Sequence, residues 1–296
     1  MQFFDPLTQL ILSQAQTPEE ARQLAEDLVR VDWHSMFVLK EHCEREIASI
    51  QQQINEDTSA LGVCQLCKMH KAMAEMVTHL KTCLQRQESL RARVRSQMYP
   101  KFLIFVEGSD FPAYWGYVEM GQGSRLSALD EILRKTWLEC CGHLSAFTIG
   151  GRRYESHADV SEDWNPLEAD SMEATLEQVL HLGMTFGYEY DFGSSTDLKL
   201  RVIDAYERKS LKGRSAPVLA RNIPPVISCF LCNQPATRVC PQCREYDSLG
   251  GRGWYCLRCA KQHECDVERM LPVVNSPRVG VCGYTGRAYH LSHEDF

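Results

Sequence analysis

The first 97 residues have the hydrophobic spacing of amphipathic helices. A hydroxyl at Thr17, followed by Pro18 and a carboxylate at Glu20, is the usual signal for the start of a helix. Apolar side chains then recur every three or four residues, at Ala21, Leu24, Leu28 and Val31 and again at Cys43, Ile47, Ile50 and Ile54. Such spacing keeps them on one helix face. Residues 1–97 are therefore predicted to form an antiparallel helical hairpin.

From Lys101 the pattern changes to the alternation of β-strands. Segments such as KFLIFVEG, AYWGYVEM and DLKLRVIDAYE are rich in β-branched and aromatic residues, and Gly150-Gly151 marks a hairpin turn. A helical stripe follows the second segment, at Leu129, Ile132, Leu133 and Trp137. The order of these elements predicts an antiparallel sheet with helices on one side, at residues 98–212. The fold class is therefore α+β.

One predicted strand has a fully aromatic face. Four aromatic residues alternate with smaller or charged ones, so they are expected to point to the same side of a sheet: Phe186, Tyr188, Tyr190 and Phe192. We expect this face to pack in the core, although it could also stack on nucleic-acid bases. Asp191 follows the strand and is expected to accept backbone hydrogen bonds in the next turn.

The last third of the chain has the cysteine spacing of a zinc-binding module. Three Cys-x-x-Cys pairs are followed by a histidine and another cysteine, at Cys229/Cys232, Cys240/Cys243, Cys256/Cys259, His263 and Cys265. Two residues between thiolates allow both sulfurs to reach one tetrahedral ion. A disulfide framework is the alternative. The opening residues carry no secretory signal, so we expect a reducing, cytoplasmic compartment, in which such cysteines hold metal.

This segment, CFLCNQPATRVCPQCREYDSLGGRGWYCLRCAKQHEC, resembles the HIT and MYND zinc fingers. The resemblance implies a module at residues 226–296 that holds two structural zinc ions through alternating ligand pairs. The first set would be Cys229, Cys232, Cys256 and Cys259, and the second Cys240, Cys243, His263 and Cys265. Because His263 and Cys265 lie close together in the chain, Cys282 is an alternative for the last position.

A further cysteine cluster lies upstream, in CQLCKMHKAMAEMVTHLKTC. His79 and Cys83 are one helical turn apart and can meet the pair Cys64 and Cys67, so we expect one more zinc ion here. The segment is similar to one zinc site of the TAZ type. The alternative is a metal-free helix with buried cysteines, because Met73, Val77, Leu80 and Leu84 form an apolar stripe.

The central strands carry a third resemblance. FPAYWGYVEM, HLSAFTIGGRRY and YEYDFGSSTDLKLRVI resemble the plasmid pRiA4b Orf-3-like family over residues 100–210. The family usually has an acidic residue and a tryptophan after its Tyr-Asp-Phe-Gly signature, where this chain has Ser194, Ser195 and Thr196. The resemblance implies a fold and assigns no reaction to particular residues.

Charge and missing motifs limit the function classes. The formal charge is −7, and zinc-bound thiolates make it more negative, which disfavours nonspecific nucleic-acid binding. No apolar run is long enough to cross a bilayer. Sequence signatures of zinc deaminases, metalloproteases and nucleotide-binding loops are absent. We therefore expect a non-enzymatic adaptor that binds another protein through the finger and the acidic loop after Tyr154. Nucleic-acid binding through the zinc modules and an undetected enzymatic role are the alternatives.

Overall fold

The computed structural model describes residues 61–90, 97–156, 169–209, 217–245, 252–265 and 267–286. The chain divides into two compact units, Met1–Gln53 and Ile54–Phe296, and all described residues belong to the second. The helices predicted for residues 1–60 lie outside the described residues. So does most of the acidic loop, at residues 157–168.

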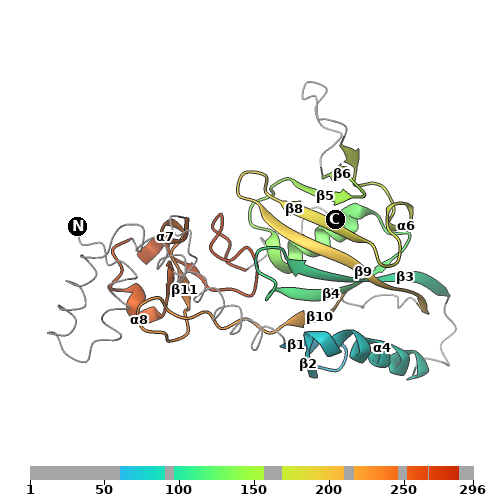
Figure 1. Ribbon diagram of the computed structural model, residues 1–296, viewed down its shortest axis with the longest axis horizontal. Helices are drawn as coiled ribbons and strands as arrows, with labels where there is room; N and C mark the ends of the chain where they lie inside the picture. The colour runs from blue at the N-terminus through green and yellow to red at the C-terminus, as the bar shows by residue number, and fades with distance from the viewer. Residues whose placement is uncertain are drawn as a thin grey trace, which may run out of the picture. The chain divides into compact units, whose positions relative to one another are not determined.

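In the described part of the chain, ten strands form one sheet, in the order β2-β1-β10-β4-β3-β9-β8-β5-β6-β7 (Figure 1). Its centre is β4 (Trp115–Gly121), β3 (Met98–Gly108), β9 (Thr196–Lys209) and β8 (Thr185–Tyr190). On one side follow β5 (Ser145–Ile149), β6 (Arg152–Glu155) and β7 (Asp170–Ser171); on the other lie β10 (Val218–Asn222), β1 (Leu61–Cys64) and β2 (His70–Ala72). All neighbours pair antiparallel except β6 and β7. This is the expected α+β fold with a mixed sheet.

Both faces of the sheet are buried. Along β3, Phe102, Ile104 and Val106 enter one hydrophobic cluster, whereas Leu103 and Phe105 enter another. Because successive side chains of a strand point to opposite faces, the apolar run KFLIFV is that of a strand covered on both sides.

Different helices cover the two faces. Leu126, Leu129 and Leu133 of α5 (Leu126–Leu133) join the first cluster, together with η1 (Arg134–Leu138) and α6 (Leu176–Val179). Met76 and Leu80 of α4 (Met73–Leu90) join the second. The prediction of helices on one side only was therefore wrong. It placed the residues of α4 in a separate helical hairpin, whereas α4 packs on the second face of this sheet.

Strands from three predicted segments share this sheet. β1 and β2 come from the segment predicted as helical, and β10 comes from residues 213–225, between the two predicted domains 98–212 and 226–296. All three strands are short, so the alternation of side chains gave little signal. The predicted hairpin at Gly150-Gly151 is confirmed: it joins β5 and β6, and both glycines have positive φ (57° and 82°).

The cysteine-rich residues form a second, three-stranded sheet in the order β12-β11-β13. Its strands are β11 (Arg238–Val239), β12 (Trp254–Tyr255) and β13 (Leu271–Pro272). Three short helices complete the module, α7 (Pro241–Glu245), α8 (Leu257–Ala260) and η2 (Val267–Arg269). One of its two small hydrophobic clusters includes Tyr114, which precedes β4 of the large sheet.

Candidate metal centres

Four clusters of cysteine and histidine side chains bring their ligand atoms within 4.8 Å of one another, and each of them can hold a metal ion. Three are the predicted sets. The fourth was not predicted. The clusters are Cys229/Cys232/Cys256/Cys259, Cys240/Cys243/His263/Cys265, Cys64/Cys67/His79/Cys83 and Cys140/Cys141/His143/Cys282. We call them the first finger cluster, the second finger cluster, the α4 cluster and the loop cluster.

The first finger cluster has the spacing of a tetrahedral thiolate site. A Zn–S bond of about 2.3 Å places two sulfurs about 3.8 Å apart in a tetrahedron. The Cys232 sulfur lies 3.6 Å from that of Cys256 and 3.5 Å from that of Cys259. These distances are far too long for a disulfide of about 2.05 Å. The fold therefore gathers these thiols without pairing them.

Local structure orients the third Cys-x-x-Cys pair of the finger, Cys256 and Cys259; we call each such pair a knuckle. Cys256 is the N-cap residue of α8, where its sulfur accepts a hydrogen bond from the Cys259 N–H at 3.5 Å. This hydrogen bond is the main reason that the pKa of the Cys256 thiol is lowered to about 6. The hydrogen bond with Cys232 instead raises the pKa of Cys259 to about 12. A cation would therefore bind in competition with protons, since metal ligands must be thiolates.

The second finger cluster contains Cys265 and leaves Cys282 out. The Cys243 sulfur lies 3.3 Å from Nε2 of His263 and 3.7 Å from the sulfur of Cys265. The ring of Tyr255 packs 4.4 Å from the imidazole of His263 and holds it beside the knuckle. Crowding of His263 and Cys265 does not prevent both from reaching the cluster. Cys282 lies elsewhere, in the loop cluster, so the structure places Cys265 and not Cys282 beside His263.

The α4 cluster joins a β-turn to a helix. Cys64 ends β1, and the turn that follows is closed by the Lys68 N–H donating to the carbonyl of Cys64 at 2.8 Å. From α4, Nε2 of His79 lies 3.2 Å from the Cys67 sulfur and 3.4 Å from that of Cys83. Cys67 is exposed, which a small core hydrophobe would not be. The metal-free alternative does not explain its position.

The loop cluster combines residues from distant parts of the chain. Cys140, Cys141 and His143 follow η1, whereas Cys282 is 139 residues beyond His143. The first three residues lack Cys-x-x-Cys spacing, so the sequence does not mark them as a metal site. The sequence does contain a weak signal for this site. His143 lies two residues after the adjacent pair Cys140-Cys141, and Cys282 lies outside the Cys-x-x-Cys pairs.

The Tyr-Asp-Phe-Gly segment, residues 190–193, and the residues after it are hydrogen-bonded to Arg278, which lies near the C-terminus. As predicted, Asp191 accepts hydrogen bonds from the backbone N–H groups of Gly193 and Ser194, at 3.2 and 3.3 Å. Arg278 donates to the carbonyl of Ser194 and to the hydroxyl of Thr196, both at 3.0 Å. The residues that depart from the family signature therefore contact a fully buried arginine.

The Asp191 carboxylate is stabilised in its charged form. Burial raises its pKa, but the hydrogen bond and charge of Arg278 and the two backbone N–H groups outweigh burial and lower the pKa below its ordinary value. The result is an ion pair between Asp191 and a guanidinium that has no exposed surface.

Comparison with known proteins agrees with the predicted central domain. Residues 104–225 match a family model. Its description is "Plasmid pRiA4b ORF-3-like protein", and the matched residues include β10. The zinc-finger types named above have no such support. No curated protein matches the chain.

A solved structure also matches: the crystal structure of MM3350, a protein of unknown function from Methanosarcina mazei Go1. The two proteins share 16% sequence identity, and the TM-score is 0.34. The match covers 41% of this chain and 67% of that chain.

Proposed function

We propose that this protein is a zinc-binding, non-enzymatic adaptor in which zinc has a structural role. The observation that carries the proposal is that each predicted set supplies four protein ligands at tetrahedral spacing. Structural zinc sites have four protein ligands, whereas catalytic sites keep a position open for water or substrate. Free thiols of this kind belong to a reducing compartment such as the cytoplasm.

Zinc would replace the hydrophobic core that the finger lacks. One of its two clusters consists largely of the candidate ligands themselves, with Tyr255, Ala260 and Met270 as its other buried members. So small a core stabilises little by itself. A structural zinc ion contributes on the order of 10 kcal/mol to folding in such modules. The finger therefore depends on its metal for its shape.

The knuckles of the first finger cluster present apolar side chains to solvent. Leu231 is 50% exposed and Leu257 is 57% exposed, and each lies inside a Cys-x-x-Cys pair of that cluster. The two knuckles meet where the sulfurs of Cys232 and Cys256 lie 3.6 Å apart. Exposed leucines on a rigid support favour contact with an apolar segment of another protein.

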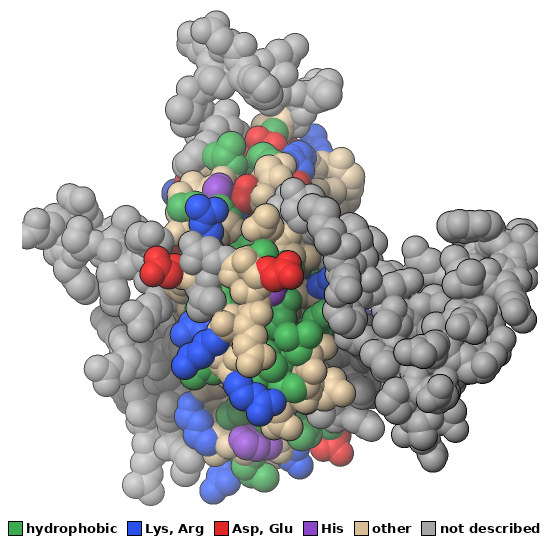
Figure 2. Space-filling model, turned by 90° about the vertical axis from the view of Figure 1, so that its left-hand side faces the viewer, with side chains coloured by type: hydrophobic (Ala, Val, Ile, Leu, Met, Phe, Trp, Pro, Cys, Tyr) green, Lys and Arg blue, Asp and Glu red, His purple; other side chains and the backbone are tan. Residues whose placement is uncertain are grey.

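Nucleic-acid binding is the second candidate, and four observations weigh against it. The formal charge is −7. The aromatic side chains of β8 are buried in the core as expected, with Tyr188 2% and Tyr190 0% exposed, whereas Phe192 lies after the strand and is 39% exposed. Arg221, in β10, is stacked on Trp137, and burial lowers the pKa of its guanidinium. Figure 2 shows Lys and Arg side chains dispersed among uncharged ones over the described part of one face.

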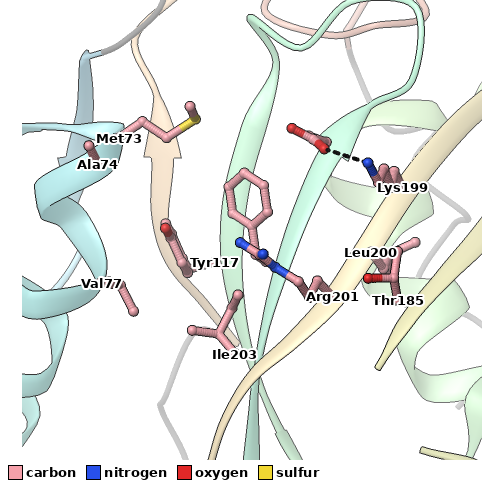
Figure 3. Close-up of a pocket in the computed structure, with 11 residues that line it drawn as sticks. Met73, Ala74, Val77, Tyr117, Thr185, Lys199, Leu200, Arg201 and Ile203 are labelled. Atoms are coloured by element: carbon pink, nitrogen blue, oxygen red, sulfur yellow. Dashed lines mark ion pairs between the residues drawn. The ribbon is translucent and has the colours of Figure 1, made fainter. Parts of the chain in front are cut away.

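An enzymatic role would need a site, and a groove of about 420 Å³ lies between α4 and the sheet (Figure 3). Its floor is apolar, with Phe105, Tyr117 and Ile203, and Lys199 lies 3.9 Å from Glu107 at one side. The opposite charges of Lys199 and Glu107 largely neutralise each other. The lining also includes Thr185 and Arg201. We propose that the protein acts by binding, because the four-ligand clusters support a structural role more directly than this groove supports catalysis.

The test uses the full-length chain and a variant with both leucines changed, Leu231→Asp with Leu257→Asp. The matched control is Leu182→Asp, since Leu182 is 58% exposed but lies outside the finger, in the segment between α6 and β8. A partner captured from the host is purified and titrated against all three proteins. We expect the double variant to bind about tenfold or more weakly, which corresponds to about 1.4 kcal/mol, and the control to bind normally.

Equal binding by all three proteins would reject the proposed surface. A parallel titration with mixed-sequence DNA and RNA at about 150 mM salt addresses the second candidate. Submicromolar binding that weakens steeply with added salt would favour nucleic-acid recognition instead.

A further inference from the structure

We propose that the loop cluster holds a fourth zinc ion, which fastens the C-terminal segment at residues 275–284 to the central sheet. Three of its side chains, Cys140, Cys141 and His143, lie in the loop between η1 and β5. The fourth, Cys282, comes from the C-terminal segment. The inference does not depend on whether the finger binds a partner.

The ligand atoms of the loop cluster have the same spacing as those of the predicted clusters. The sulfur of Cys141 lies 3.6 Å from that of Cys140 and 3.7 Å from that of Cys282. Nε2 of His143 lies 2.9 Å from the Cys141 sulfur and 3.1 Å from the Cys282 sulfur. Thiolates about 3.8 Å apart surround one tetrahedral zinc ion, whereas a disulfide needs about 2.05 Å.

The orientation of His143 is independent support for a metal. Its Nε2 faces the sulfurs, while its Nδ1 lies 3.5 Å from Oδ1 of Asp191. The ring of Tyr190 packs against the imidazole at 5.8 Å, nearly perpendicular to it. Histidines that bind zinc typically turn their other nitrogen to a carboxylate, which fixes the ring and makes the ligand nitrogen more basic. Asp191 is placed for this role.

The charge around the cluster also fits a bound zinc ion. Three thiolates and one Zn²⁺ leave a net charge of about −1. Arg278, which is fully buried, donates from Nε to the Cys140 sulfur at 3.4 Å and from a terminal nitrogen to Oδ2 of Asp191 at 2.5 Å. A buried guanidinium requires anionic partners. Asp191 balances the single positive charge of Arg278. The Nε–H that points at the Cys140 sulfur would then donate to a zinc-bound thiolate, which accepts hydrogen bonds better than a neutral thiol.

A metal at this position would join two parts of the fold. Besides Arg278, the segment contributes Ser276, which donates to the Trp137 carbonyl at 2.5 Å, and Tyr284, which is buried in the larger core. On its other side Val279 packs with Val239 and Trp254 of the finger. The same ten residues therefore contact both the sheet and the finger. The ion would hold that connection at its exposed end, where Cys141 and Cys282 lie at the surface.

The first test uses the unmodified full-length protein, with its metal, and measures how fast each cysteine reacts with N-ethylmaleimide. Cys141 and Cys282 are exposed, so without metal they should react quickly. With zinc bound we expect both to react roughly tenfold or more slowly, and a chelator to abolish the difference. Fast reaction in the holo-protein, while Cys229 and Cys240 stay protected, would overturn the proposal. A disulfide between Cys141 and Cys282 in the unreduced peptide map would overturn it as well.

The second test counts zinc in Cys282→Ser by native mass spectrometry. We expect one ion fewer than in the unchanged protein. His181→Ser is the control, because His181 is an exposed histidine among the described residues and lies outside the four clusters, and this variant should keep the full count. An unchanged count in Cys282→Ser would overturn the proposal. If this variant does not fold, the alkylation rates of the unmodified protein still decide the question.

Discussion

At the level of single residues, spacing along the chain determines which ligands can be recognised from sequence. Each predicted cluster contains a Cys-x-x-Cys pair, and its remaining ligands lie close enough in the chain to be grouped with it. The loop cluster has neither property, because Cys282 reaches it only through the packing of the C-terminal segment. Local spacing therefore predicts the sites that a short segment can build alone. It misses the one that requires the tertiary fold.

The ion pair of Arg278 leads to a prediction at this scale. Arg278→Met should destabilise the protein by about 3–5 kcal/mol, because Asp191 would remain as a buried charge without its partner. Urea unfolding followed by tryptophan fluorescence, with zinc present, measures this loss.

The matched control is Arg152→Met. Arg152 lies 3.6 Å from Asp170 in a pair whose side chains are 73% and 47% exposed, so its loss should cost less than about 1 kcal/mol. Equal effects of the two substitutions would show that burial of the Arg278 pair contributes nothing to stability.

At the level of elements, the length of each segment sets what the hydrophobic pattern can reveal. β3 and β9 are long, and the stripe at Leu129, Leu133 and Trp137 is buried as predicted. β1, β2 and β10 have three to five residues each, too few for alternation to stand out. The stripe of α4 was also visible. The sequence did not show what this stripe packs against, because an apolar stripe identifies the buried face of a helix but not the element that covers it.

The packing of α4 is testable through one of its core residues. Leu80 is fully buried with Leu103, Phe105 and Tyr117 of the sheet. Leu80→Ala should lower the free energy of unfolding of the sheet by about 2–5 kcal/mol, because it leaves a cavity beneath β3 and β4. Hydrogen exchange of the β3 and β4 amides, together with urea unfolding, measures this effect.

The neighbouring Lys81 provides the control. Its side chain is 51% exposed and lies 2.8 Å from Asp204, so Lys81→Ala should change stability by less than about 1 kcal/mol. If Leu80→Ala left the sheet unaffected, α4 would be an independent element, as the predicted boundary at residue 97 implies.

At the level of the whole molecule, the cysteine and histidine clusters of the described residues lie where segments meet. The α4 cluster joins a turn of the sheet to a helix, the two finger clusters join the knuckles, and the loop cluster joins the C-terminal segment to the loop after η1. The predicted boundaries at residues 97 and 226 remain predictions. The contacts of Tyr114 with Val239 and of Arg278 with Asp191 show that residues on both sides of the second boundary pack together.

No helix among the described residues is long and apolar enough to cross a membrane. The sequence predicted the fold class and the central family resemblance, since both depend on patterns repeated over many residues. It could not predict that helices cover both sheet faces or that the C-terminal segment returns to the central sheet. Both depend on contacts between distant parts of the chain.

The central claim is that each four-residue cluster holds one zinc ion on which the surrounding fold depends. Native mass spectrometry of the full-length chain, purified without chelators, tests it most directly. We expect a folded species carrying four zinc ions, one for each cluster. Their removal by a chelator should shift the protein to the higher charge states of an unfolded chain. A folded species that carries no metal, or that keeps its charge states when the metal is removed, would contradict the claim.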